Sequence, residues 1–401
     1  MESHGRRDRV LVAGGSFAGL EATLALHHLL SERIDLVMLT PRGELTYRPL
    51  AVEEPFTMRP PERRALGPIL EELGYRLERD AIARVLPDER AIETAAGKRL
   101  EYDGLIVCVG GRMRSPYERA ATISAPGEEI DIDAVLLSAG ELADERIALI
   151  VPPGSTWPLP IYEIALLAER RARELGRREA RIAIFTHEPA PLSLFGQVPS
   201  DAVAELLERR GIEVHTNVRV IEEEGELYAI PDRTRIEAGI VIALPEVDGP
   251  ALEGLPSDER GFIPIDEHCR VPGLERVYAA GDATAFPVKQ GGLATQQADA
   301  AAEHLAAELG AEVQPQPFQP VLRGQLIAGA ESLHLRQALT GGHGEGDISP
   351  DYLWWPPQKV AGRFLAPFLG GEALGAGSRL AEGSLIDVEV PLEGQQGGED
   401  P

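Results

Sequence analysis

The sequence predicts an α/β fold with largely parallel sheets, divided over two domains and a small C-terminal region. Short apolar segments alternate with helical segments along most of the chain. A glycine-rich turn joins the first apolar segment to the first helical one. The 401 residues also exceed the length of one ordinary domain. These observations favour a multi-domain enzyme.

The first predicted unit runs from strand to helix to strand. Residues 9–13 form a short apolar strand, 14–19 a turn, 20–30 a helix and 34–39 a second strand. This length is that of a βαβ unit, about 30 residues.

The same alternation continues through the middle of the chain. Further strands are predicted for short apolar runs at 104–109, 146–151, 181–186, 239–243 and 276–280. Helices are predicted near 161–175, 200–210 and 294–309. Beyond residue 314 the pattern changes to Pro-rich extended segments, and a polar tail from Glu393 onward is expected to be disordered.

The composition excludes several classes of function. The chain has 39 Lys and Arg against 65 Asp and Glu, and its net charge of −26 repels nucleic acids and anionic membranes. Its two cysteines, Cys108 and Cys269, allow no disulfide framework and no cysteine-based zinc site. No apolar run reaches the ~18 residues that span a bilayer. We expect a cytoplasmic protein, and we expect no metal, since its histidines show no metal-binding spacing.

The glycine-rich turn is a candidate phosphate site. It reads Gly14-Gly15-Ser16-Phe17-Ala18-Gly19. Gly14 permits a tight turn, Gly19 lets the helix pack on the strand, and the helix N-terminus directs N–H groups at a pyrophosphate. Ser16 replaces the second glycine of this fingerprint, so an ordinary turn without a ligand stays an alternative. In its strand-to-helix context, the turn favours a Rossmann-like dinucleotide site.

The end of the second strand departs from that pattern. Many dinucleotide sites place an acidic residue there to bind a ribose, but this chain has Thr40-Pro41-Arg42. This difference argues against NAD at the first site.

Two later segments strengthen the prediction of a Rossmann-like dinucleotide site. The apolar run Val277-Tyr278-Ala279-Ala280 ends in Gly281-Asp282, and Lys289-Gln290-Gly291-Gly292-Leu293-Ala294 then opens a helix. With the first turn, they resemble the two-dinucleotide-binding-domain flavoproteins (pyridine nucleotide-disulfide oxidoreductase-like). The resembling branch holds type II NADH dehydrogenases, sulfide:quinone oxidoreductases and flavocytochrome c sulfide dehydrogenases. The resemblance covers roughly residues 9–310.

This resemblance implies FAD as the cofactor, held by a domain built from two parts of the chain. Residues 1–115 and 261–314 would form the FAD domain, 116–260 a second dinucleotide-binding-like domain, and 315–401 the C-terminal region. Asp282 would bind the flavin's ribitol chain, and the helix near Ala294 would direct its positive end at the flavin. The implied cofactor-binding residues are Gly14, Gly15, Ser16, Phe17, Ala18, Gly19, Thr40, Arg48, Gly110, Gly281, Asp282, Lys289, Gly292, Leu293 and Ala294.

The middle domain lacks both usual signatures of an electron donor site. After the strand at 146–151 stands Pro152-Pro153-Gly154 in place of a second glycine fingerprint, and prolines supply no N–H groups to a phosphate. The relatives that oxidise sulfide use cysteines beside the flavin, and this loop has none. Standard NADH binding and ordinary sulfide oxidation are both disfavoured.

Two polar side chains are candidate catalytic residues. Glu163 is proposed as an acid or base and Lys289 as a cation, both beside the flavin. The alternatives are a helix-terminal acid and a surface lysine. The aromatic residues around Trp354, Trp355 and Phe364 either pack against the fold or form a quinone or membrane contact, and packing is favoured.

Three hypotheses follow. The first is an FAD-dependent oxidoreductase that passes electrons from a small reductant to a quinone-like acceptor. The second is an NAD(P)H-dependent flavin dehydrogenase or reductase, with Glu188 on the ribose. The third is a flavin-bound interaction protein without turnover. The oligomeric state is left open.

Overall fold

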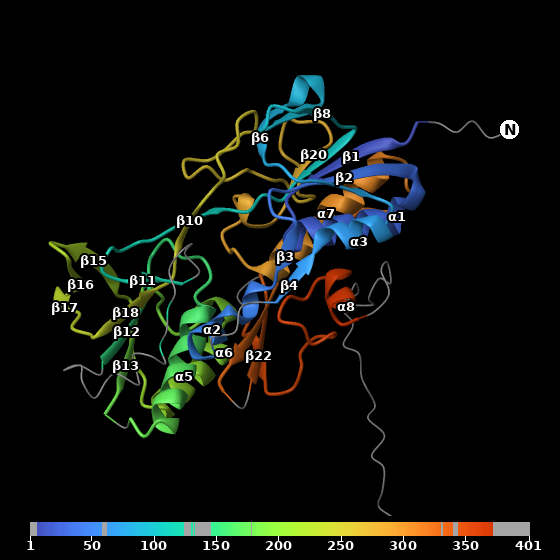
Figure 1. Cartoon of the computed structure of the whole chain (residues 1–401). Helices are drawn as coiled ribbons and strands as arrows, with labels where there is room; N and C mark the ends of the chain where they lie inside the picture. The colour runs from blue at the N-terminus through green and yellow to red at the C-terminus, as the bar shows by residue number, and fades with distance from the viewer. Residues whose placement is uncertain are drawn as a thin grey trace, which may run out of the picture.

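The computed structural model describes residues 6–57, 62–123, 130, 132, 146–177, 179–329, 332–339 and 344–371. Two parallel sheets form the centres of two α/β units, and a small antiparallel sheet from the C-terminal part lies beside the second (Figure 1). The expected tail from Glu393 lies outside the described residues.

The first sheet combines strands from the two separate parts of the chain that were predicted to form one domain, residues 1–115 and 261–314. Its order is β20-β9-β1-β2-β5, and every pair in it is parallel. The strands are β1 (Asp8–Ala13), β2 (Ile34–Leu39), β5 (Arg76–Glu78), β9 (Gly104–Val107) and β20 (Val277–Ala279). β20 therefore adds at the edge of a sheet whose other strands come from the first 107 residues.

Two helices pack against each other on one face of this sheet. They are α1 (Phe17–Leu30) and α7 (Gly291–Glu308), and apolar residues of both belong to one core with the sheet. Alanines at 298, 300, 301 and 302 keep α7 narrow, so the two helices approach closely. The other face is covered by the antiparallel strands β6 (Ile82–Leu86), β7 (Ala91–Thr94) and β8 (Arg99–Glu101) and by loops.

The second sheet repeats the parallel design in the middle of the chain. Its order is β11-β18-β12-β13-β14. The strands are β11 (Ala121–Thr122), β12 (Arg146–Val151), β13 (Arg181–Thr186), β14 (Glu213–His215) and β18 (Ile240–Ala243). Helices α5 (Leu159–Glu174) and α6 (Gln197–Arg209) place their apolar residues in a core with this sheet. A small hairpin sheet, β15 (Arg219–Glu223), β16 (Glu226–Ile230) and β17 (Thr234–Arg235), extends it.

A two-stranded link connects the two units. β10 (Arg112–Arg114) leaves the first unit and pairs antiparallel with β19 (Glu246–Asp248), which returns from the second. The remaining short elements are β3 (Glu44–Thr46), α2 (Glu54–Thr57), β4 (Arg63–Ala65) and α3 (Leu66–Glu72).

The C-terminal part holds a sheet that the expectation of extended Pro-rich segments missed. β21 (Val321–Ile327), β22 (Ser332–Ala338) and β23 (Asp347–Ser349) form an antiparallel sheet, followed by the short helix α8 (Leu365–Leu369). In β21, Leu322 and Leu326 are fully buried in the second unit's core, and Arg323 between them is not. This alternation is the signature of a half-buried strand.

The predicted ranges agree with the structure to within a few residues. The strands at 146–151 and 181–186 match β12 and β13, whereas α7 begins three residues before the predicted 294. The four-part domain division stays a prediction. No helix among the described residues is long and apolar enough to cross a membrane.

Candidate functional site

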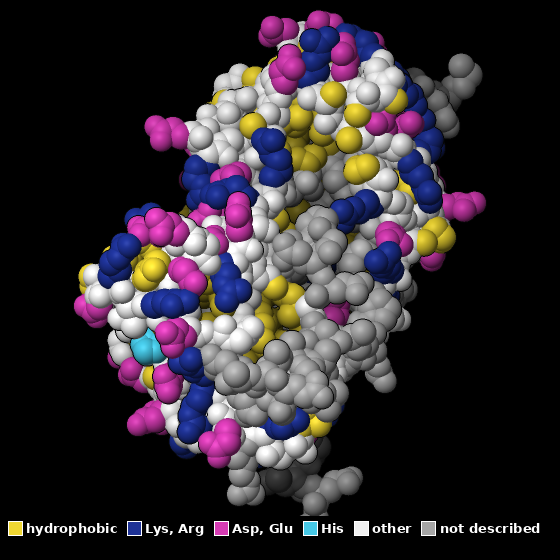
Figure 2. Space-filling model, turned by 60° about the vertical axis from the view of Figure 1, so that its left-hand side comes forward, with side chains coloured by type: hydrophobic (Ala, Val, Ile, Leu, Met, Phe, Trp, Pro, Cys, Tyr) yellow, Lys and Arg dark blue, Asp and Glu magenta, His cyan; other side chains and the backbone are white. Residues whose placement is uncertain are grey.

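A cavity of about 950 Å³ lies where the first unit, the second unit and the C-terminal part meet. Figure 2 shows apolar side chains gathered in the hollow that crosses this face of the molecule. Each of the three parts contributes residues to its wall, among them Ser16, Asp282, Trp157 and Lys359. The glycine turn and the C-terminal part therefore share one cavity.

The glycine turn forms one end of the cavity. Gly14 has φ +124°, and a Cβ on it would lie 2.0 Å from the Cys108 carbonyl oxygen. A Cβ on Gly19 would lie 1.9 Å from the Gly14 carbonyl oxygen, so only glycine allows α1 to pack this closely. Ser16 is the N-cap of α1 and makes no side-chain capping hydrogen bond. Its hydroxyl and the N–H groups of the first turn are thus free for an anion.

The end of β2 supplies no acid to this cavity. Thr40 is buried, and its hydroxyl donates to the Arg42 carbonyl at 3.2 Å. Arg42 itself is exposed and lines the cavity. A cation stands here in place of the usual ribose-binding carboxylate.

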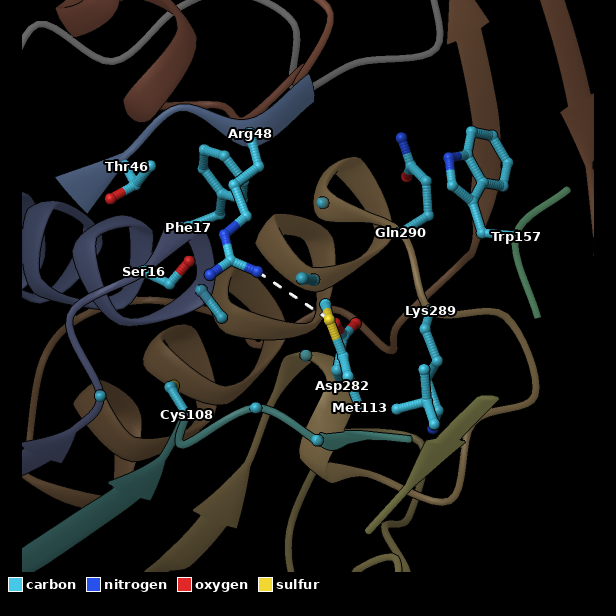
Figure 3. Close-up of a pocket in the computed structure, with 18 of the residues that line it drawn as sticks. Ser16, Phe17, Thr46, Arg48, Cys108, Met113, Trp157, Asp282, Lys289 and Gln290 are labelled. Carbon is cyan, nitrogen blue, oxygen red and sulfur yellow. Dashed lines mark hydrogen bonds between the residues drawn. The ribbon is translucent and has the colours of Figure 1, made fainter. Parts of the chain in front are cut away.

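The end of β20 brings a half-buried carboxylate to the cavity wall. Gly281 has φ +78°, and the Gln297 side chain accepts its N–H at 2.7 Å. This turn places Asp282 on the cavity (Figure 3). Burial raises the pKa of Asp282, while the nearby Lys289 ammonium opposes that shift. No described residue forms a hydrogen bond with the Asp282 carboxylate, which leaves it available to a ligand hydroxyl.

Lys289 is held by the loop that follows Asp282. Its ammonium donates to the carbonyl oxygens of Thr284 and, at 2.7 Å, of Phe286, and it lies 3.8 Å from the centre of the Phe262 ring. Burial lowers the pKa of Lys289 to about 8, although Asp282 partly compensates. The side chain is 8% exposed and lines the cavity, so the alternative of a surface lysine is wrong.

The start of α7 is shaped by Gln290, which sequence reasoning did not select. Its side chain accepts the Leu293 N–H at 2.8 Å and donates to the Arg323 carbonyl at 3.2 Å. The residue thus caps α7 and anchors β21. It also lines the cavity with Gly291 and Ala294, whereas Gly292 and Leu293 do not. The Leu293 N–H is already bonded, and its side chain is buried in the core.

Glu163 lies on the cavity but is firmly bound to the C-terminal part. Its Oε1 accepts the Ile327 N–H at 2.9 Å and the Lys359 ammonium at 2.6 Å. Burial raises the pKa of Glu163, and Lys359 opposes that rise. Its second oxygen has no hydrogen-bond partner within the described chain. Sequence reasoning did not connect Lys359 with Glu163.

The middle unit contributes Ser155, Thr156, Trp157, Leu159, Pro160 and Glu163 to the cavity wall. Trp157 and Gln290 lie together at one end of Figure 3, with Lys289 near them, while Ser16 and Cys108 lie at the other. Pro158 is the N-cap of α5 and Pro160 stands in its first turn, and neither has an N–H to offer.

The acid at the end of β13 is not available to a ribose. Glu188 is 6% exposed, and it accepts the Tyr162 hydroxyl at 2.7 Å and the Thr186 hydroxyl at 3.0 Å. Burial raises its pKa to about 7. It does not line the cavity.

Most of the predicted site residues come together. Those that line the cavity are Gly14, Gly15, Ser16, Phe17, Ala18, Thr40, Arg48, Gly110, Glu163, Gly281, Asp282, Lys289 and Ala294. Gly19 lies behind the turn that it allows, and Arg48 approaches Met113 at 4.0 Å (Figure 3). Trp157, Arg323 and Lys359 also line the cavity and were not predicted.

The cysteines show no reactive environment. Cys108 and Cys269 are free and buried, and burial raises the pKa of Cys108 to about 12. A thiolate is therefore strongly disfavoured at neutral pH. Within the described ranges, no group of three or more His, Cys, Asp or Glu side chains is placed to hold a metal ion.

These residues fit a dinucleotide cofactor with a polyol chain. A Cβ would fill the close approach at Gly14, the first turn of α1 opens to the cavity, and Asp282 offers an unbonded carboxylate. The sites for a pyrophosphate and for a hydroxyl-bearing chain thus share one wall.

Comparisons with known proteins agree with this geometry. Residues 163–304 match the family described as pyridine nucleotide-disulphide oxidoreductase. The chain is 21% identical to a sulfide-quinone reductase of Aquifex aeolicus, over 69% of each chain. It is 25% identical to an NADH dehydrogenase-like protein of Mycobacterium tuberculosis, over 69% of this chain and 73% of that one.

A solved structure shows the same fold. The sulfide:quinone oxidoreductase of Aquifex aeolicus superposes with a TM-score of 0.77 at 17% identity, covering 85% of this chain and 86% of that one. The predicted fold class and the resemblance to this flavoprotein family are confirmed, and with them FAD as the cofactor.

Proposed function

We propose that this FAD-dependent oxidoreductase passes electrons from a small reductant through the flavin to a quinone-like acceptor. The observation that carries the proposal is the single cavity shared by the glycine turn, Asp282 and the C-terminal wall. A cofactor on the first unit would present its reacting end to the walls formed by the middle and C-terminal parts. The sulfide-quinone reductase similarity adds support for a quinone acceptor.

The residues of the first unit would hold the cofactor. The N-terminus of α1, with Ser16, would bind the pyrophosphate, and Asp282 would accept a hydroxyl of the ribitol chain. When bound, FAD supplies a carrier for two electrons. Arg42, at the end of β2, would lie toward the adenosine half.

Lys289 is the proposed cation of the reaction site. Its ammonium is fixed by two carbonyl oxygens, and it shares the cavity wall with Asp282. A fixed positive charge in a site shielded from water stabilises negative charge that develops beside it. With a pKa of about 8, Lys289 also holds a proton that it can release near neutral pH.

Glu163 is better described as a positioning residue than as the acid or base expected. Its carboxylate holds Lys359 on the cavity wall and fixes the end of β21 through Ile327. Both contacts join the middle unit to the C-terminal part. We propose that these two contacts shape the end of the cavity where the electron donor and acceptor would bind.

The alternative of an NAD(P)H-dependent dehydrogenase has one argument in its favour. The middle unit keeps the parallel sheet of a dinucleotide-binding domain, and one relative is an NADH dehydrogenase-like protein. Against it stand the prolines at the start of α5 and the burial of Glu188. We therefore favour a reductant other than a nicotinamide nucleotide, and we place the enzyme in the cytoplasm as part of the proposal.

The acceptor is tested with the purified holoprotein. The protein is reduced anaerobically with one equivalent of dithionite and mixed with a short-chain ubiquinone or with buffer. The proposal expects the oxidised flavin spectrum to return with the quinone and not with buffer. Absence of flavin from the purified protein, or no reoxidation by any quinone tried, would contradict it.

A further inference from the structure

Arg323 is a cation on the cavity wall that has no counter-charge among the described residues. It lies in β21, the edge strand of the C-terminal sheet, whose backbone is anchored to the start of α7 by Gln290. A Cβ on Gly324 would lie 2.5 Å from the Phe195 ring, so the Gly324 face of β21 packs on the middle unit. Because strand side chains alternate, Arg323 and Gln325 project together from the other face. Both line the cavity.

The Arg323 guanidinium has no protein partner in the part of the chain that the structure describes. Its Nε is buried without a hydrogen bond, and no carboxylate lies within ion-pair distance of the group. Burial, and the like charge of Arg336 on the next strand, lower the pKa of Arg323 to about 10. A buried, unpaired charge is unfavourable unless something else compensates it.

Three neighbouring cations are paired with carboxylates of the protein. Lys359 is paired with Glu163 at 2.6 Å, and Arg363 with Glu303 at 2.7 Å. Arg336, directly opposite Arg323 in the sheet, is paired with Asp347 at 2.7 Å. Arg42 and Arg48 also line the cavity and form no ion pair with a described residue, but both are exposed to solvent. Arg323 differs from them because its Nε is buried.

A second donor stands beside this guanidinium. The Gln325 side chain lies two residues along the same face, about 7 Å away by strand geometry. No described residue forms a hydrogen bond with its amide. A guanidinium fork with a nearby amide matches a small planar anion, which can accept two N–H bonds from one arginine.

We propose that Arg323 binds the anionic group of the small reductant, a carboxylate or another oxyanion. This inference rests on the proposed function, since quinones are neutral and an anionic group must then belong to the donor. Although the chain has a net charge of −26, Arg323 would give it a local binding site for an anion. The site lies in the cavity that holds Asp282 and Lys289, so the bound donor would face the cofactor.

The test follows the visible spectrum of the flavin in the oxidised holoprotein. Benzoate and inorganic sulfate are titrated separately, to distinguish a carboxylate from an inorganic oxyanion, with neutral benzamide as control. We expect a saturable spectral change with at least one anion and none with benzamide. In R323Q the dissociation constant should rise about tenfold or more, the loss expected for a charge-assisted hydrogen bond.

The matched control is R336Q, which removes a neighbouring cation that is paired with Asp347 and does not line the cavity. It should bind the same anion within about twofold of the unaltered protein.

A second readout needs no ligand. R323M removes the unpaired charge and should raise the melting temperature of the holoprotein by about 2–4 °C.

Three results would overturn the inference. They are no spectral change with either anion, equal affinity in R323Q and the unaltered protein, or loss of flavin from R323Q, which would mean that the guanidinium binds the cofactor. Reoxidation by quinone is measured on the same samples. If it persists while anion binding fails, the anion site alone is wrong and the proposed function stands.

Discussion

The two parallel units of this molecule share the arrangement of four strands and differ in the fifth, and we infer that they offer different halves of a dinucleotide site. The outer strand of the first sheet, β20, is its last in the chain, whereas the outer strand of the second, β11, is its first. In the first, the turn after β1 retains Gly14 and Gly19, but β2 ends in Thr40 without an acid. In the second, β13 is followed by the acid Glu188, but prolines stand at the start of α5. The first unit therefore offers backbone N–H groups at the start of α1, whereas the prolines at the start of α5 have none to offer.

We propose that the middle unit uses this fold without a nucleotide ligand. The carboxylate at the end of β13 now accepts the Tyr162 and Thr186 hydroxyls and has become part of the middle unit's interior. At the start of α5, Glu163 holds the C-terminal part instead of leaving the helix end open to a phosphate. The sheet is retained because its core depends on apolar burial, which the loops do not affect.

The largest expected effect comes from adding a methyl group to the first turn. In G19A the new Cβ would lie 1.9 Å from the Gly14 carbonyl oxygen, a rigid backbone atom. We expect most of the flavin to be lost and the free energy of unfolding to fall by about 3 kcal/mol or more. Flavin absorbance per mole of protein and urea denaturation measure these changes.

The matched substitution in the second unit is G154A, in the loop before α5. There the new Cβ would meet the Glu246 side chain at 2.6 Å, and a flexible carboxylate can move aside. G154A should keep its flavin. Equal flavin loss in the two variants would remove the distinction between the two turns.

The next effect concerns the ion pair between Glu163 and Lys359. Either K359M or E163Q leaves a buried charge without its partner, which should cost about 3–5 kcal/mol of unfolding free energy. The double variant E163Q/K359M should cost clearly less than the sum of the two, because neither charge remains. Denaturation of all four proteins gives the coupling energy.

An exposed ion pair on the same helix, α5, is the control for this comparison of single and double variants. Arg170 and Glu174 are 44% and 46% exposed, so R170Q should change stability by about 0–1 kcal/mol. Additive costs in the Glu163 cycle would show that this pair does not join the middle unit to the C-terminal part.

A third prediction uses the pH dependence of stability. The fold raises the pKa of Glu188 from 4.5 to about 7, so it favours the protonated acid. The stability that this protonated acid contributes is complete below about pH 4.5 and is lost as the pH rises through 7. At pH 8 the ionised carboxylate should cost about 3 kcal/mol.

E188Q cannot ionise and should escape that cost. Its stability relative to the unaltered protein should therefore increase from pH 5 to pH 8, as denaturation midpoints at each pH would show. Glu21, whose pKa burial also raises to about 7, is present in both proteins and cancels in the difference. A difference that does not change with pH would mean that Glu188 is solvated and open to a ligand.

The smallest expected effect concerns flavin binding by the acidic residues of the two units, Asp282 and Glu188. The Asp282 carboxylate lies on the cavity wall and forms no hydrogen bond with a described residue, whereas Glu188 is bonded inside the middle unit. D282A should raise the flavin dissociation constant about 10–100-fold, which corresponds to about 1.4–2.7 kcal/mol of charge-assisted hydrogen bonding. E188Q should leave it unchanged. The opposite result would place the cofactor on the middle unit.

Local patterns in the sequence were sufficient for the first unit. Glycine, a short apolar strand and the following helix lie within consecutive residues, so the turn at Gly14 and the strand ending in Gly281-Asp282 could be recognised directly. The candidate residues on these segments meet at the cavity because parallel strands end on the same edge of a sheet.

The C-terminal wall could not be recognised in this way. Lys359 meets Glu163 across 196 residues of sequence, and no local pattern encodes such a pairing. For Arg323, the alternation of Leu322, Gly324 and Leu326 was a usable signal of a strand, although a glycine and an arginine interrupted its apolar character. The acid or base role of Glu163 stays a prediction, and nothing in the sequence indicated that this residue is buried against Lys359.

The central claim is that the middle unit has kept the fold of a nicotinamide-nucleotide site but not its function. The most direct measurement is anaerobic mixing of the oxidised holoprotein with NADH and, separately, with NADPH, followed at the flavin absorbance. We predict no bleaching over minutes with either nucleotide, while dithionite bleaches the same sample. Bleaching within seconds by NADH or NADPH would contradict the claim.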